Sequence, residues 1–205
     1  MSGIHESRSI VKYLIDKKEL NELYISIVLR SLAFSMIGIF VPLFLFKELS
    51  YSLSQLCYYY IIYSLVFVVF TPIGAKLGSC FGIKHIILLS LPFYILYFAL
   101  LYFLKAEPIL FFIIPIIYGI SDGIFWINFH IDFSTFSKKK DRGSQVGRYY
   151  RFALLAGLTG PVIGGAILTF STFNTLFIIV SLLLLGSAVP LFFTKDIKKD
   201  YKFSY

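Results

Sequence analysis

Six long apolar segments alternate with short polar segments along the chain. Each apolar segment holds about 20 residues, which is the length needed to cross the hydrocarbon core of a bilayer as an α-helix. The segments are Glu22–Phe46, Ser52–Gly74, His85–Leu104, Ile109–Ile131, Tyr149–Phe170 and Thr175–Phe193. The pattern therefore predicts an all-α membrane protein with six transmembrane helices.

The polar segments divide the chain into three parts. Residues 1–21 form a polar N-terminal segment, residues 22–194 the transmembrane bundle, and residues 195–205 a basic tail. In the first part, Ile10, Tyr13 and Leu14 have the spacing of one apolar helical face. This spacing predicts a short helix on the cytoplasmic surface of the membrane.

Composition and charge agree with a membrane protein. The 205 residues are 58% hydrophobic and only 15% charged, and the mean hydropathy is +0.82. The formal charge of +8 is not gathered into a nucleic-acid patch, because sixteen of the 19 Lys and Arg residues lie in segments that one side of the membrane would share. By the positive-inside rule, both termini are expected in the cytoplasm of a cell-membrane (inner-membrane) protein.

The stretch Gly147–Gly165 combines small residues with a proline inside the fifth apolar segment. Ala156, Gly160 and Gly164 recur every four residues, so a helix would place them on one face that a neighbouring helix can approach closely. Pro161 removes a backbone donor and predicts a kink. The stretch is interpreted either as a structural packing helix or as a helix that rocks or bends during transport.

A weak internal repeat accompanies this stretch. Pro72-Ile-Gly-Ala75, near the end of the second segment, is similar to Pro161-Val-Ile-Gly-Gly-Ala166 in the fifth. Two three-helix units of opposite orientation would produce such a repeat, as in many secondary transporters.

With these features, the chain resembles the N-terminal half of a major facilitator superfamily transporter. The family's fifth-helix motif reads Gly, eight residues, Gly, three residues, Gly-Pro, two residues, Gly-Gly. The matching positions here are Gly147, Gly160, Pro161, Gly164 and Gly165. The central glycine is replaced by Ala156, a change between two small residues. The resemblance implies one six-helix half of the family's fold, built as two inverted three-helix repeats.

A second family motif, in the loop after the second helix, is only partly present. The positions that fit are Leu77, Gly78, Gly82 and Lys84. The family's Asp, thought to latch the two halves together, is Ser79 here, and the following Arg is Cys80. The Arg that proton-coupled members carry four residues before a glycine of the fourth helix is also missing, because Pro115 stands there.

Two charged residues fall inside apolar segments. Arg30 lies roughly 10 Å, and Asp122 roughly 15 Å, from the cytoplasmic ends of the first and fourth helices, at 1.5 Å per residue. A lone charge at such a depth costs about 3 kcal/mol even on insertion scales, so each needs a partner or water. In the fold that the chain resembles, these helices are neighbours lining a central cavity. The two charges are therefore expected to meet, either as a structural pair or as part of the transport site, unless Arg30 reaches the cytoplasm instead.

The candidate substrate or coupling site consists of Arg30, Asp122, Trp126, Tyr118 and His130. Tyr118 and Trp126 share a helical face with Asp122, and His130 lies one turn beyond Trp126. Nearer the surface, Asp132 is predicted to pair with Arg148 or Arg151. Aromatic residues near membrane surfaces usually act as anchors, which is the interpretation given to Tyr58, Tyr59, Tyr60 and Tyr63.

The favoured function is secondary active transport of a small solute by alternating access, with a coupling ion such as a proton as a further partner. The alternative is a non-transporting membrane scaffold or receptor-like protein that keeps the half-fold. Neither a catalytic motif nor a metal-ligand spacing is visible, so we expect no enzyme activity, no metal, no cofactor and no nucleic-acid partner. Because full family members have about twelve helices, we expect an incomplete chain or a half-transporter that pairs with a second half or another copy.

Overall fold

The computed structural model describes residues 2–137 and 141–192, with side chains from Leu20 onward. The described residues form six membrane-length helical spans and no strand. The helices are α1 (Ser2–Gly38), α2 (Phe40–Leu43), the π-helix η1 (Phe44–Glu48), α3 (Leu53–Phe81), α4 (Ile83–Phe103), α5 (Leu110–Phe136), α6 (Arg142–Phe170) and α7 (Phe173–Phe192). The predicted all-α membrane fold is confirmed. The basic tail, residues 195–205, lies outside the described residues.

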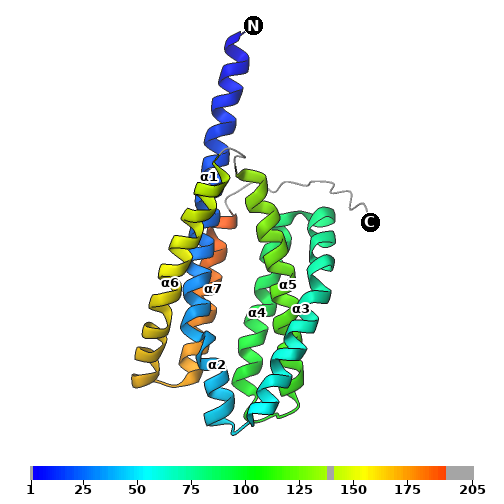
Figure 1. Ribbon diagram of the computed structural model, residues 1–205, viewed down its shortest axis with the longest axis vertical. Helices are drawn as coiled ribbons and strands as arrows, with labels where there is room; N and C mark the ends of the chain where they lie inside the picture. Colours follow the sequence, from blue (N-terminus) through cyan, green and yellow to red (C-terminus); the bar gives the residue numbers. More distant parts are fainter. Residues whose placement is uncertain (1, 138–140, 193–205) are drawn as a thin grey trace.

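The helices form two groups of three that lie side by side (Figure 1). In one group α1 packs against α6 and α7, and in the other α5 packs against α3 and α4. Contacts between α4 and α7, and fewer between α1 and α5, join the groups. Exchanging α1 with α5, α3 with α6 and α4 with α7 leaves this set of neighbours unchanged. Such a symmetry is expected of two inverted three-helix repeats.

The first span is not one uninterrupted helix. The α-helix α1 ends at Gly38, and the chain continues through α2 into the π-helix η1. Pro42 has no N–H to donate to the carbonyl of Gly38, and its ring crowds the preceding turn, which accounts for the break. The predicted short surface helix is wrong, because residues 2–38 form a single helix that projects beyond the bundle (Figure 1).

Two predicted connections are shorter than expected. The connection between the second and third segments, expected over Ala75–Lys84, is reduced to Gly82, and α5 and α6 both extend into the segment expected between them. The sequence boundaries followed the ends of the apolar runs, whereas a helix continues past the hydrocarbon region as long as its residues allow. Gly82 ends α3 with φ of 106°, a conformation that glycine adopts without strain.

Close backbone contacts at glycine residues, here called glycine seams, join α1 to α6 and α5 to α3. A Cβ added to Gly160 would lie 2.8 Å from the backbone N of Met36, and one added to Gly164 would lie 2.2 Å from the Met36 carbonyl oxygen. Ser35 Oγ also donates to the Ala156 carbonyl at 2.9 Å. The predicted close approach on this face of α6 is confirmed, and its partner is α1. Gly147 and Gly165 are not part of this seam, since an added Cβ would meet no atom within 4 Å at Gly147 and only Phe40, at 3.6 Å, at Gly165.

The equivalent seam lies between α3 and α5. A Cβ on Gly74 would come within 2.9 Å of the Ile124 Cα, and one on Gly119 within 2.7 Å of the Tyr63 carbonyl oxygen. Asn128 bridges the helices, because its Nδ2 donates to Gly74 O at 2.9 Å and to Ile124 O at 2.8 Å. Gly74 and Gly164, which lie in the two similar stretches Pro72–Ala75 and Pro161–Ala166, thus each take part in one of the two seams.

Gly78→Ala is expected to destabilise the protein by about 1–3 kcal/mol, the usual cost of overpacking. The added Cβ would lie 1.8 Å from Asn128 Oδ1, so the amide must move away from the carbonyls that it bonds. Thermal unfolding in detergent measures the loss. Gly186→Ala is the control, because a Cβ there meets no atom within 4 Å. Asn128→Ala combined with Gly78→Ala should recover part of the loss, and a double variant as unstable as the sum of the two singles would contradict this contact.

Candidate functional site

Arg30 and Asp122 meet in the interior, between α1 and α5. The Nη2 of Arg30 lies 3.6 Å from Oδ1 of Asp122, and the two side chains are 2% and 7% exposed. The predicted meeting of the two charges is confirmed, and Arg30 does not extend to the surface. The distance exceeds the 2.7–3.2 Å of a normal N–H···O bond, so the contact is an ion pair rather than a hydrogen bond.

The carboxylate of Asp122 is held by two tyrosines of the same helix group. Tyr63 on α3 donates its hydroxyl to Oδ2 at 2.7 Å, and Tyr94 on α4 donates to Oδ1. Hydrogen bonds to a charged acceptor are stronger than neutral ones, and here each carboxylate oxygen receives one. Asp122 is therefore fixed in orientation by α3 and α4, independently of α1.

Arg30 has a very different environment. Its guanidinium carbon lies 3.4 Å from the ring centroid of Phe125, 4.2 Å from that of Tyr94 and 4.7 Å from that of Phe34. These rings stabilise the positive charge through cation–π contact but offer no lone pair. Within the described part of the chain, Nε, Nη1 and Nη2 of Arg30 have no hydrogen-bond acceptor. The positive charge of Arg30 is thus balanced by Asp122, but its N–H groups donate no hydrogen bond to another described residue.

The pair lies in the wall of a cavity of about 420 Å³. Residues from α1, α3, α4 and α5, together with Val41 of α2, surround it, so the cavity lies where the two helix groups face each other. The lining residues are Ile27, Arg30, Ser31, Phe34, Ile37, Gly38, Val41, Tyr60, Tyr97, Tyr118, Asp122 and Trp126. The volume is within the range of cavities that bind small molecules.

A family comparison identifies the kind of protein that carries this cavity. The family model of the Major Facilitator Superfamily matches residues 23–204, which is most of the chain. The chain belongs to the Major Facilitator Superfamily. A comparison with curated proteins finds no match. Members of this superfamily are membrane transporters of small solutes, so the chain is a transporter-family membrane protein whose described spans form the six-helix half-fold.

Four of the five candidate site residues come together in this major facilitator chain. Arg30, Asp122, Tyr118 and Trp126 all line the cavity. The fifth, His130, is exposed and outside the lining, although its ring stacks on Trp126 with the centroids 5.8 Å apart. Any role of His130 in this site would act through Trp126.

Sequence reasoning identified Tyr118 but missed the other tyrosines that organise the site. Tyr63 was interpreted as a membrane-surface anchor together with its neighbours, but it faces Asp122, and Tyr59 is completely buried. Tyr118 lies between Tyr63 and Tyr97, with centroid distances of 4.5 and 4.6 Å and nearly parallel planes. The four-residue interval between Tyr59 and Tyr63 was the available signal, since it places both rings on one face of α3.

The ends of the helices carry a second set of buried polar groups. Asp132 is 2% exposed, whereas Arg148 and Arg151 are exposed, and the predicted ion pair between them stays a prediction. Lys84, a position that fits the family's second-loop motif, is buried, with Nζ 5.1 Å from the Phe136 ring centroid. Ser79, which stands where the family has its latch Asp, donates to the Lys76 carbonyl of its own helix at 2.8 Å.

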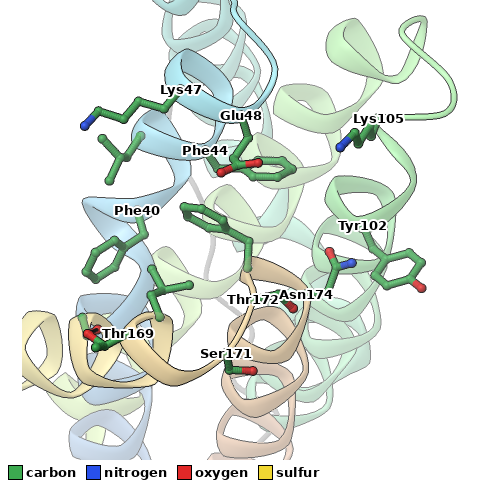
Figure 2. Close-up of a pocket in the computed structure, with 14 residues that line it drawn as sticks. Phe40, Phe44, Lys47, Glu48, Tyr102, Lys105, Thr169, Ser171, Thr172 and Asn174 are labelled. Carbon is green, nitrogen blue, oxygen red and sulfur yellow. Dashed lines mark hydrogen bonds between the residues drawn. The ribbon is translucent and has the colours of Figure 1, made fainter.

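A second cavity, of about 630 Å³, lies at the opposite end of the bundle, beside η1 and the turn between α6 and α7. Figure 2 shows Lys47 and Lys105 on opposite sides of it, with Glu48 and the Phe44 ring between them. Its other polar groups are Thr169, Ser171, Thr172, Asn174 and Tyr102. Its charged residues, Lys47, Glu48 and Lys105, are exposed, so its chemistry is less defined than that of the buried interior pair. Among the described residues, no group of three His, Cys, Asp or Glu side chains could hold a metal ion.

Proposed function

We propose that this major facilitator chain is a secondary active transporter that moves a small solute through the cavity between α1 and α5. The observation that carries the proposal is the buried Arg30–Asp122 pair in the wall of that cavity, 3.6 Å apart and surrounded by aromatic side chains. A charged pair at membrane depth is expensive to bury, and such residues usually mark solute or ion pathways.

The transport step requires the two helix groups to change their separation at the cavity. Asp122 is bound by α3 and α4, whereas Arg30 belongs to α1, so the ion pair spans the division between the groups. The glycine seams keep α1 with α6, and α5 with α3, as rigid units. Alternating access then takes the form of rocking between packed units around a fixed central site.

A second six-helix half is part of the proposal. The spans of α3 and α6 have the smallest buried shares, 11% and 17%, against 50% for α5. These two helices therefore offer the most surface to lipid or to another half. The second half is either a continuation of the same polypeptide, another chain, or a second copy of this one.

Orientation and coupling complete the proposal. The C-terminal ends of α3, α5 and α7 lie at the same end of the bundle as the N-terminal part of α1 (Figure 1). We place this end on the cytoplasmic side of a cell membrane, because most Lys and Arg residues flank it. We propose the carboxylate of Asp122 as the carrier of a coupling proton, because it is the acidic group in the cavity lining and buried membrane carboxylates commonly serve in proton relays.

Accessibility of a cysteine in the cavity tests this function without knowledge of the solute. Cys57 and Cys80 are exposed and unbridged, so both are first replaced by Ser. Ser31→Cys then places one thiol in the cavity lining. In proteoliposomes with the protein in known orientation, a membrane-impermeant methanethiosulfonate should label this thiol from either side. Leu182→Cys, on an exposed position of α7, is the lipid-facing control and should react from neither side. Labelling of Ser31→Cys from one side only would favour the alternative of a non-transporting scaffold.

A further inference from the structure

Asp122 and Arg30 differ in how many of their hydrogen-bonding groups have a partner. Both oxygens of Asp122 already accept a tyrosine hydroxyl, and its charge is balanced by Arg30. By contrast, the three guanidinium nitrogens of Arg30 have no acceptor among the described residues. They are also shielded from solvent, because Arg30 is only 2% exposed. Arg carries five N–H donors in a planar fork. Buried donors in such number normally have partners, so this site is built to receive an acceptor.

Within the proposed transport function, we propose that the solute is a small organic anion, and that its carboxylate or phosphate group binds the free donors of Arg30. The guanidinium fork matches both groups geometrically and can bind either in a bidentate way. Arg30 and Asp122 are the charged residues of the lining. A cationic solute would have to compete for an Asp122 carboxylate that two tyrosines and Arg30 already occupy.

The other residues that line the cavity indicate what kind of molecule carries the anionic group. Apart from the charged pair, Ser31 and Gly38, the side chains are apolar or aromatic, and Phe34, Tyr60, Tyr118 and Trp126 supply ring surfaces. Aromatic faces and edges favour a planar or aromatic partner. The volume of about 420 Å³ suits a solute of one or two rings. The inferred class is therefore a small aromatic or otherwise planar carboxylate or phosphate.

Four matched probes test this assignment in the Ser31→Cys protein. Benzoate and phenyl phosphate are the anions, benzyl alcohol is neutral and benzylammonium is the cation, all with the same ring. An anion bound at Arg30 should shield the neighbouring thiol and slow its labelling about ten-fold at a probe concentration roughly ten times its Kd, because only the unoccupied sites then react. Benzyl alcohol and benzylammonium should change the rate little.

Removing the guanidinium provides the matched control. Arg30→Gln with Asp122→Asn replaces both charged groups by neutral amides, which keeps the site free of an unpaired buried charge. In this background the anions should lose their protection, while the thiol still reacts. Protection by benzylammonium rather than by the anions, or by none of the probes, would overturn the anion assignment. Labelling from one side only would instead overturn the transport proposal, so the two failures are distinguishable.

Discussion

Asp122→Asn is expected to destabilise the protein by about 3–5 kcal/mol, the usual cost of removing one partner of a buried ion pair. The amide keeps the shape of the carboxylate but not its charge. Arg30, which is 2% exposed, would then be a buried cation balanced by aromatic rings alone. For a chain of this size each kcal/mol moves the Tm by about 2–4 °C, so a decrease of about 10 °C is expected in detergent.

The double variant Arg30→Leu/Asp122→Leu separates charge from packing. Replacing a buried pair by apolar residues is often neutral or stabilising, so this variant should regain most of the stability lost by Asp122→Asn. Asp141→Asn, at an exposed position, is the control and should change the Tm very little. If the double variant were as unstable as Asp122→Asn, loss of the tyrosine bonds to Asp122, rather than the unpaired Arg30, would explain the effect.

Gly160→Leu is expected to have the largest effect of any single change on α6. Even a Cβ at this position would lie 1.8 Å from Ser35 Oγ and 2.7 Å from its Cβ. A leucine must therefore push α6 away from α1, and the 2.9 Å bond from Ser35 to the Ala156 carbonyl would be lost. The loss should exceed the 1–3 kcal/mol of ordinary overpacking, because backbone atoms as well as side chains must move.

The comparison with Gly157→Leu makes this prediction specific. Gly157 is in the same helix, one turn earlier, and a Cβ there meets no atom within 4 Å. Both variants gain the same helix-forming side chain, so a difference between them reports the contact with α1. Folded yield and Tm in detergent are the measurements. Equal stability of the two variants would mean that α6 does not pack on α1 through this face.

The helix count, the inverted-repeat symmetry of the helix contacts and the meeting of Arg30 with Asp122 could be predicted from the sequence. The grouping of α1 with α6 and α7, rather than with the other helices of its own repeat, could not. Length and polarity alone decide which segments can span a bilayer, and a membrane-buried charge requires a partner. Small residues at four-residue spacing likewise identified the face of α6 that packs on α1. These signals are strong because the bilayer tolerates few alternatives to them.

The tyrosines of the site could not be assigned in the same way. In a soluble protein, apolar positions mark the inner face of a helix, but in a membrane both the lipid-facing and the inner faces are apolar. The four-residue interval groups Tyr59 with Tyr63 on one face of α3, but polarity does not show whether that face points inward or whether the face of Tyr58, which is 61% exposed, does so. The break after Gly38 was missed for a related reason, since Pro42 is tolerated within an otherwise apolar span.

Transport through the cavity lined by Arg30 and Asp122 is tested most directly by solute flux into proteoliposomes that contain the chain or its Arg30→Leu/Asp122→Leu variant. The solute is whichever of the four aromatic probes protects Ser31→Cys best, supplied in radiolabelled form. Uptake is expected for the original chain and none above empty vesicles for the double variant, even though that variant remains folded. Equal uptake by the two proteins would contradict this expectation, because the charged pair would then be structural and the solute would cross elsewhere.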